Sequence, residues 1–376
     1  MLLNLTNAPR DYAWGSTSLL AELEGREPTG APEAEVWFGD HPGDPADVAG
    51  GGTLDAVTGG ELPYLLKLLA AADPLSIQVH PTIEQAKSGW EREAGLALDD
   101  PHRNYRDDNH KPELIVALSD RFEALSGLRP VAHTRRMLDV LDDRGGVVEL
   151  RARLDEAGDA LRETIGWLLS GRAQAAVDDV IAAVAAAAAR SGETEFGATL
   201  QTVSRIAERN PGDPGVVVAL LMNHVVLRRG EGIFLRAGLL HAYLEGLGVE
   251  IMAASDNVLR GGLTPKHIDV AELLSVLDTT PGEVPVLRPE AEGAVTAYPV
   301  PIPDFALRRV SLGGTPVDVD VEGPTMVLST QGDVAVAGAD GHEHHVAVGA
   351  VVFATADERM LRLTGSGEAF IATPGR

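Results

Sequence analysis

The sequence contains no cysteine among its 376 residues. This absence excludes disulfide bonds, thiolate zinc sites and cysteine nucleophiles, and it leaves the redox environment of the protein open. Any metal site must therefore be built from nitrogen and oxygen ligands. A chain of this length buries a sizeable hydrophobic core, so neither a disulfide nor a structural metal is needed merely to fold it.

Long hydrophobic runs are also missing. The longest uncharged apolar stretches are residues 215–227 and 180–189, and both are shorter than the roughly 18 residues that suggest a membrane span. Residues 1–14 show no basic segment followed by a sustained apolar one, as an export signal would. We therefore expect a cytoplasmic protein without a membrane partner.

Basic residues are scarce relative to acidic ones. The chain has 31 lysines and arginines against 56 aspartates and glutamates, which gives a formal net charge of −25. A surface this acidic argues against nucleic acid and anionic lipid as partners. An anionic substrate would need a local basic pocket.

Turn-forming residues are plentiful, with 41 glycines and 23 prolines. They separate many short apolar runs, and short strands at regular spacing are typical of a sandwich or barrel. In the first part of the chain, the runs that predict strands are residues 75–79, 113–118, 216–227 and 233–235. In the last hundred residues they are 325–328, 334–336, 346–353 and 369–373.

One block has a different pattern. Between residues 130 and 210 apolar side chains recur at helical spacing, and half of residues 171–190 are alanine, the best helix former. The run Asn-Pro-Gly-Asp-Pro-Gly at 210–215 cannot continue a helix. The sequence thus predicts a mainly β protein with an α-helical insertion. The expected parts are a β domain formed by residues 1–129 with 215–280, helices in 130–214, and a second β domain in 281–376.

Four segments collect polar residues that a purely structural explanation accounts for poorly. In residues 74–81 (PLSIQVHP), strand alternation places Ser76, Gln78 and His80 on one face and the apolar residues on the other. The remaining three segments are residues 104–113 (NYRDDNHKPE), 238–250 (GLLHAYLEGLGVE) and 251–267 (IMAASDNVLRGGLTPKH). Each segment alone is also compatible with ordinary surface, a loop or a core histidine.

Taken together, the segments supply a set of metal-binding groups. Two imidazoles, one carboxylate and one amide oxygen come from His80, His241, Glu113 and Gln78. A nitrogen and oxygen set without thiolates suits zinc or another borderline divalent ion, and open coordination positions would make the site catalytic. The spacing alone does not show that these residues converge.

Residues 74–81, 104–113, 241–246 (HAYLEG) and 255–269 (SDNVLRGGLTPKHID) closely resemble the type I phosphomannose isomerase family. Two N-terminal stretches, 12–16 (YAWGS) and 35–39 (EVWFG), are similar to its signatures as well. The resemblance runs from about residue 10 to 128 and from 215 to about 277. The helical block and the last hundred residues match the family in general character only.

The resemblance implies cupin (jelly-roll) β domains and an aldose–ketose isomerase that interconverts mannose 6-phosphate and fructose 6-phosphate. It implies one zinc ion per chain, with the ligands falling on Gln78, His80, Glu113 and His241. The family's catalytic arginine falls on Arg260. Further active-site positions carry over to Trp14, Lys67, Ser76, His110, Lys111, Glu250 and Asp256.

From the chemistry we assign roles to these positions. Arg260 is expected to stabilise the enediolate, because a guanidinium is a poor base. The candidates for proton transfer are Lys111, Glu250, His110 and Asp256, which the sequence does not rank. Lys67 and Ser76 are expected at the phosphate end of the substrate, since both donate hydrogen bonds to phosphate oxygens. Trp14 completes the expected substrate-binding residues.

Other interpretations remain open at this stage. The chain could be a non-catalytic sugar-phosphate-binding cupin, or a cupin oxygenase that uses iron. Residues 341–345 (GHEHH) could form a second metal site, although an exposed hairpin tip fits the preceding turn residues better. The expected partner is a small hexose 6-phosphate, and the expected assembly is a monomer or a weak homo-oligomer.

Overall fold

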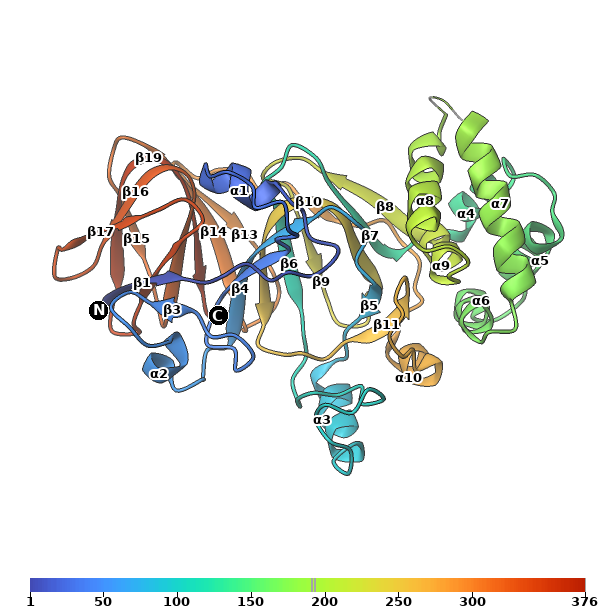
Figure 1. The fold of residues 1–376 in the computed structure, drawn as a ribbon, viewed down its shortest axis with the longest axis horizontal. Coiled ribbons are helices and arrows are strands. Elements are labelled where there is room, and N and C mark those ends of the chain that lie inside the picture. Colours follow the sequence, from blue (N-terminus) through green and yellow to red (C-terminus); the bar gives the residue numbers. More distant parts are fainter. Residues whose placement is uncertain (191, 193, 376) are drawn as a thin grey trace.

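The computed structural model describes residues 1–190, 192 and 194–375. Two antiparallel β-sheets lie next to each other, and a group of helices covers the far end of one of them (Figure 1). The prediction of a mainly β fold with a helical insertion is confirmed.

The first sheet is organised around its longest strand, β10 (His241–Ala253). This strand pairs with β4 and β6 along its second half and with β5 and β7 along its first half. The other strands of the sheet are β2 (Glu35–Phe38), β4 (Tyr64–Ala71), β5 (Ile77–Val79), β6 (Glu113–Ala117), β7 (Phe122–Leu128), β8 (Met222–Leu227), β9 (Gly232–Leu235), β11 (Leu259–Gly262) and β12 (Val286–Leu287).

The second sheet combines the C-terminal strands with the beginning of the chain. Strand β1 (Leu2–Thr6) pairs with β18 (Val351–Ala354), so the start of the chain completes the C-terminal sheet. The other strands are β3 (Asp47–Val48), β13 (Val295–Tyr298), β14 (Ala306–Gly313), β15 (Val317–Asp320), β16 (Thr325–Ala337), β17 (Glu343–Val346) and β19 (Met360–Thr373). The division of the chain into three parts stays a prediction. The second sheet takes β1 and β3 from the beginning of the chain, so the two sheets do not correspond to two continuous segments.

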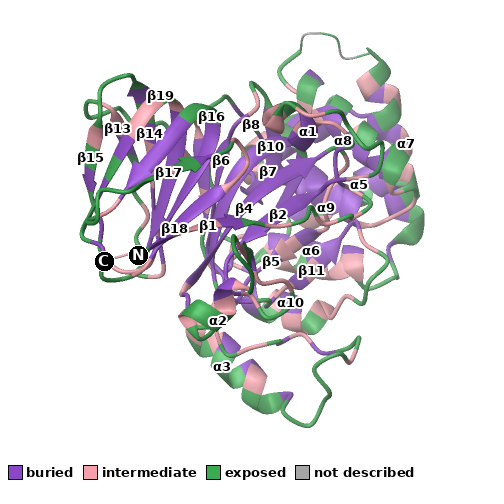
Figure 2. Ribbon diagram, turned by 60° about the vertical axis from the view of Figure 1, so that its left-hand side comes forward, coloured by how far each residue is buried: buried purple, intermediate pink, exposed green. Residues whose placement is uncertain are grey.

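The two sheets share a hydrophobic core. Leu66 and Val249 from the first sheet lie in one buried cluster with Leu328, Phe353 and Phe370 from the second. Figure 2 shows these strands as the most buried part of the molecule. The shared core fixes the first sheet rigidly, and that sheet carries the site described below.

The helical block forms where the apolar periodicity predicts it. Alanines 176, 183 and 187 of α7 are buried, so the alanine-rich segment is a closely packed core helix. Ala183 and Ala187 belong to a buried hydrophobic cluster that also includes Ile77 and Val79 of β5. This cluster joins the helices to the first sheet. The helices are α4 (Val131–Leu138), α5 (Gly145–Leu154), α6 (Ala160–Leu169), α7 (Gln174–Arg190), α8 (Gly197–Arg209) and α9 (Gly215–Leu221).

Helix α9 corrects one prediction, because residues 216–227 were expected to form a single strand. Residues 215–221 are helical instead, and the strand β8 begins only at Met222. Every residue of α9 is buried. A short apolar run that is buried on all sides has no polar face, so periodicity cannot distinguish helix from strand there. The predicted strand 346–353 is likewise interrupted, by a turn at Gly349 with φ of 84°.

The remaining helices lie outside the helical block. Helix α3 projects from the body below β5 and is almost fully exposed on its outer side (Figures 1 and 2). Its first turn is closed by a capping box between Thr82 and Gln85. The others are α1 (Leu19–Glu24), α2 (Leu54–Thr58), α3 (Ile83–Arg92) and α10 (Val270–Val276). Among the described residues, no helix combines the length and apolarity needed to cross a membrane.

Candidate active site

The pairing of β10 with its neighbours brings together side chains that lie far apart in the sequence. His241 lies opposite Gln78 of β5, and Glu250 lies opposite Lys67 of β4. Met252 is paired with Glu113 of β6. On the other edge of β5, Gln78 is paired with Arg260 of β11. The register therefore makes neighbours of residues that sequence spacing alone leaves unconnected.

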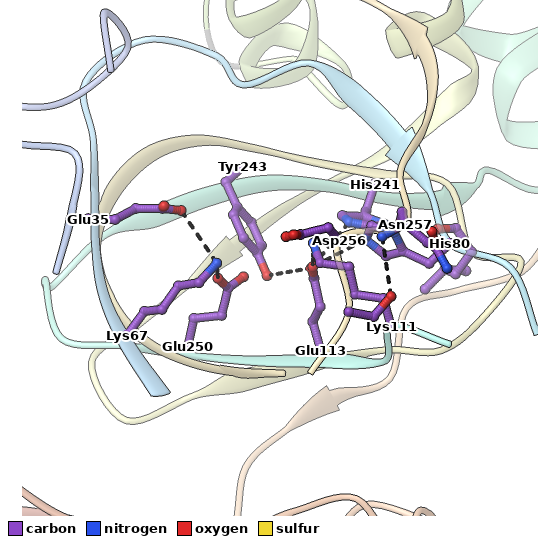
Figure 3. Close-up of polar contacts among 12 residues, drawn as sticks. Glu35, Lys67, His80, Lys111, Glu113, His241, Tyr243, Glu250, Asp256 and Asn257 are labelled. Atoms are coloured by element: carbon purple, nitrogen blue, oxygen red, sulfur yellow. Dashed lines mark hydrogen bonds and ion pairs between the residues drawn. The ribbon is translucent and has the colours of Figure 1, made fainter. Parts of the chain in front are cut away.

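His80, Glu113 and His241 form a group whose potential ligand atoms all lie within 4.8 Å of one another. The Nε2 atom of His80 is 3.2 Å from Oε1 of Glu113, and Nε2 of His241 is 3.3 Å from Oε2. All three residues are about 1% exposed. Figure 3 shows both imidazoles directed at the carboxylate.

The hydrogen bonds around the two histidines prepare them for metal binding. Nδ1 of His80 contacts the carbonyl oxygen of Asn257 at 2.7 Å, and Nδ1 of His241 contacts that of Leu239 at 2.9 Å. Nδ1–H therefore donates in both rings, and Nε2 keeps its lone pair. Both Nε2 atoms are buried without a hydrogen-bond partner, despite their closeness to Glu113. Such orphaned acceptors beside a carboxylate fit a divalent cation.

The charge state of this group also suits a cation. Burial, with Lys111 nearby, lowers the pKa of His80 to about 4, so its imidazole is neutral at physiological pH. Burial opposes the ionisation of Glu113, but Lys111 and His80 hold the pKa of its carboxyl well below the usual range. Nζ of Lys111 donates to Oε1 of Glu113 at 2.7 Å. The hydroxyl of Tyr243 reaches the other oxygen, Oε2, at 3.5 Å.

A second buried charge network lies beside the first. The ammonium of Lys67 is 3.2 Å from Oε2 of Glu250 and 3.7 Å from Oε1 of Glu35 (Figure 3). It also lies over the ring of Trp37, 5.3 Å from the centroid, and the indole Nε1–H donates to Glu35 at 2.8 Å. Although burial disfavours its charge, Glu35 and Glu250 raise the pKa of Lys67. Burial raises the pKa of Glu250, with Glu113 adding to the effect and Lys67 opposing it.

Both networks open into one cavity of about 500 Å³. Of the residues predicted from the sequence, its walls include Trp14, Lys67, Ser76, Gln78, Lys111, Glu113, Glu250 and Arg260. Gln78 therefore offers its amide from the wall next to His241. Within the part of the chain that the structure describes, Arg260 and Lys266 line this cavity without an ion-pair partner. Burial lowers the pKa of both side chains.

Four predicted site residues do not line the cavity. His80 and His241 lie against Glu113, which does line it, and the other two are His110 and Asp256. Nε2 of His110 contacts Asp304, in the bend before β14, at 2.9 Å. The carboxylate of Asp256 is 3.0 Å from Nε2 of His41. Its side chain is half-exposed. The structure thus gathers the metal-ligand candidates closely and the acid–base candidates only in part.

Several cavity residues were not among the predicted site positions. Glu35 and Tyr12 lie within the N-terminal motifs, from which only Trp14 was predicted as a site residue. Tyr243 follows His241 by two residues on the same strand, so strand alternation predicts that both face one side. Lys266 lies after a turn, where no periodicity applies.

The histidines near the C-terminus do not form a comparable group among the described residues. His342 lies in the turn before β17, and the exposed His345 is 3.9 Å from Asp333. His344 contacts the side-chain oxygen of Asn4 at 2.9 Å. The turn at Gly341 and the pairing of β16 with β17 agree with the predicted hairpin, and the rings of His342 and His344 lie 5.2 Å apart within it.

Comparison with known proteins identifies the family to which the chain is similar. Residues 2–131 match a family model described as the catalytic domain of type I phosphomannose isomerase. The mannose-6-phosphate isomerase of Escherichia coli (strain K12) is 34% identical over 389 residues, covering 96% of this chain and 97% of the relative. The human enzyme is 30% identical, covering 88% of this chain and 87% of its own.

Solved structures agree over the whole chain. A mannose 6-phosphate isomerase bound with zinc and yttrium superimposes with a TM-score of 0.88 at 32% identity, and the match covers 100% of both chains. The Salmonella typhimurium enzyme, bound to its substrate fructose 6-phosphate and zinc, gives the same TM-score, identity and coverage. The fold class predicted from the sequence is confirmed by these matches. With this similarity along nearly its whole length, the protein belongs to the type I phosphomannose isomerase family.

Proposed function

We propose that the protein interconverts D-mannose 6-phosphate and D-fructose 6-phosphate by proton transfer through an enediolate. The observation that carries the proposal is the composition of the cavity of about 500 Å³ into which both charge networks open. It combines a buried carboxylate of raised pKa, a metal-ligand group and cations without counter-ions. A sugar phosphate supplies the negative charge that these cations lack.

We assign the metal to His80, Glu113 and His241, with the amide oxygen of Gln78 as a fourth ligand. The orphaned Nε2 atoms support this assignment. Zinc is present in both related structures, beside yttrium in one of them, and an oxygen and nitrogen set of this kind suits zinc. When bound, zinc would supply Lewis-acid stabilisation of negative charge on the sugar oxygens.

Glu250 is the proposed base. Its carboxyl lines the cavity, and its raised pKa brings it closer to neutral pH, where a group can both accept and return a proton. In this assignment Glu250 removes the proton from C2 of the aldose and delivers it to C1. Lys111 lines the same wall and is the proposed donor for proton exchange between the two sugar oxygens.

The cations divide between the two ends of the substrate. Arg260 lies next to Gln78 across the strand pair, so we assign it to the charge of the enediolate. Lys266 and Ser76 line the cavity and are the proposed phosphate contacts. Lys67, which was expected at the phosphate, already lies between two carboxylates. That placement favours a role for Lys67 in neutralising Glu250 and Glu35.

A non-catalytic sugar-phosphate-binding module is the competing proposal. Recognition alone does not require a buried carboxylate of raised pKa beside the metal-ligand group, which favours the enzyme. The location in the cytoplasm and the monomeric or weakly oligomeric state stay predictions.

A coupled assay for fructose 6-phosphate formed from mannose 6-phosphate tests the proposal. We expect turnover in the purified protein, loss of turnover after chelation, and recovery when zinc is returned. A protein that binds mannose 6-phosphate with zinc restored but forms no fructose 6-phosphate would establish the binding module instead.

A further inference from the structure

The turn after β2 carries a histidine that reaches across to the loop between β10 and β11. The imidazole of His41 is 14% exposed, and its Nε2 atom is 3.0 Å from Oδ2 of Asp256. The two residues are 215 positions apart. His41 closely follows the N-terminal motif at 35–39, which the proposed function uses only through Glu35.

The hydrogen bonds determine which nitrogen of His41 holds the proton. The backbone N–H of Gly43 donates to Nδ1 at 3.0 Å. A ring nitrogen that accepts a hydrogen bond is unprotonated, so the proton is on Nε2, which donates to Asp256. A Cβ atom at position 43 would come within 3.1 Å of Nδ1, so glycine allows this close approach. The edge of the His41 ring also packs on Trp37, with centroids 4.9 Å apart.

The carboxylate of Asp256 does not line the cavity, but it interacts electrostatically with Lys111 and Lys67, which do. Burial opposes its ionisation, but the hydrogen bond from His41 and the charges of Lys111 and Lys67 hold its pKa below the usual range. Asp107 fixes the main chain at this point, since the N–H of Asp256 donates to Oδ2 of Asp107 at 2.7 Å. The main chain is therefore anchored without His41, and His41 orients the side chain.

We propose that His41 is a positioning residue that holds the carboxylate of Asp256 beside the cavity, where Asp256 assists Lys111 in proton transfer between the sugar oxygens. The inference rests on the proposed isomerase function and extends it to a residue that does not line the cavity. His41 acts through Asp256, with the neutral imidazole as a fixed donor. Because Asp107 already holds the loop, loss of His41 affects the direction of one carboxylate and leaves the metal-ligand group in place.

Two amide variants separate this role from support of the loop. In His41→Gln the amide nitrogen takes the place of Nε2 and keeps the donor to Asp256. In His41→Asn the amide oxygen takes the place of Nδ1 and keeps the acceptor for Gly43. We expect His41→Asn and His41→Ala to lower kcat about 10- to 100-fold at nearly constant KM. We expect His41→Gln to retain most of the wild-type kcat.

The controls are zinc content, the Tm of each variant and His102→Ala, which removes an exposed histidine outside the cavity. We expect the zinc content to be unchanged in every variant. In an Asp256→Asn background, His41→Ala should lower kcat no further. Nitrogen NMR of the wild-type ring should show the Nε2-protonated tautomer.

The inference is overturned if His41→Asn retains activity while His41→Gln loses it, since the loop contact then matters and the donor does not. It is also overturned if zinc content falls in parallel with kcat, or if the wild type is active and His41→Ala has the same kcat. Wild-type turnover in the same assay separates these failures from failure of the proposed function, which would show as an inactive wild type.

Discussion

The two sheets share a core but handle buried charge differently. In the first sheet, Lys67, Lys111, Glu113 and Glu250 are nearly inaccessible to solvent and lie close together around one cavity. The cluster inside the second sheet consists of aliphatic side chains from strands such as β16 and β19. The buried carboxylates in this part of the chain include Glu368, which is paired with arginines, and Glu358, which is paired with the N-terminal ammonium. Two sheets built from similar short strands thus divide catalysis and support between them.

The physical reason for the difference is the cost of burying a charge. An unpaired ion inside a protein is strongly destabilising, and even paired ions often contribute nothing net to stability. A sheet selected for stability therefore fills its interior with aliphatic side chains. A concentration of paired and unpaired charges around a cavity indicates that the first sheet binds something charged.

Removal of the central carboxylate should have the largest effect on the first sheet. We expect Glu113→Gln to lose bound zinc and to lower kcat by about 10³-fold or more, because the neutral amide no longer completes the ligand set. Metal analysis of the purified variant together with the coupled assay measures both quantities. Glu245→Gln, which changes an exposed carboxylate on the same strand, is the control and should behave like the wild type. Normal zinc content in Glu113→Gln would contradict the assignment.

Loss of the guanidinium at position 260 should be nearly as severe but should leave the metal in place. We expect Arg260→Ala to lower kcat about 10²- to 10³-fold with zinc content unchanged, because the side chain is assigned to developing charge and is not itself a metal ligand. Arg260→Lys should restore part of the rate. A near-normal kcat in Arg260→Ala would remove the residue from the mechanism.

The second sheet should respond in stability alone. Leu363 is fully buried in its aliphatic cluster. We expect Leu363→Ala to lower the free energy of unfolding by about 2–5 kcal/mol, through lost burial and the cavity left behind. Denaturant unfolding measures this change, and kcat per folded molecule should stay constant at a temperature below the transition. A large fall in kcat without loss of stability would contradict the assignment of the second sheet to structural support.

Glu123 tests whether every buried charge of the first sheet serves the cavity. This carboxylate of β7 is 1% exposed and contacts His224 at 3.3 Å and Arg205 at 2.8 Å, outside the cavity wall. Burial opposes its ionisation, but His224, Arg121 and Arg205 lower its pKa from 4.5 to about 2. The charged form is therefore favoured by folding, so its stabilisation is complete above pH 4.5 and is lost as the pH falls toward 2.

We expect Glu123→Gln to be less stable than the wild type by up to about 3 kcal/mol at pH 7, with the difference shrinking between pH 4.5 and 2. Urea unfolding at a series of pH values measures the difference. The kcat should not change, because the residue lies away from the cavity. A difference in stability that is independent of pH would assign the effect to packing.

The chain itself determined the class of fold and the chemistry that is possible. Helical spacing in residues 130–210 and short strands elsewhere predicted the mainly β architecture with its helical insertion. The lack of cysteine restricted a metal site to nitrogen and oxygen ligands, and three of the four segments supplied such ligands. These features are local, because periodicity and residue type act within one segment.

Contacts between distant segments decided the rest. The pairing of β1 with β18, the helical form of α9 and the burial of Lys67 between two carboxylates all depend on neighbours that lie far away in the sequence. The same is true of His110, which faces Asp304, and of His41, which reaches Asp256. Strand register and side-chain packing set which charges meet, and only the folded chain fixes both. The sequence thus determined which ligand and charged side chains are available, and the tertiary structure decided which of them share one cavity.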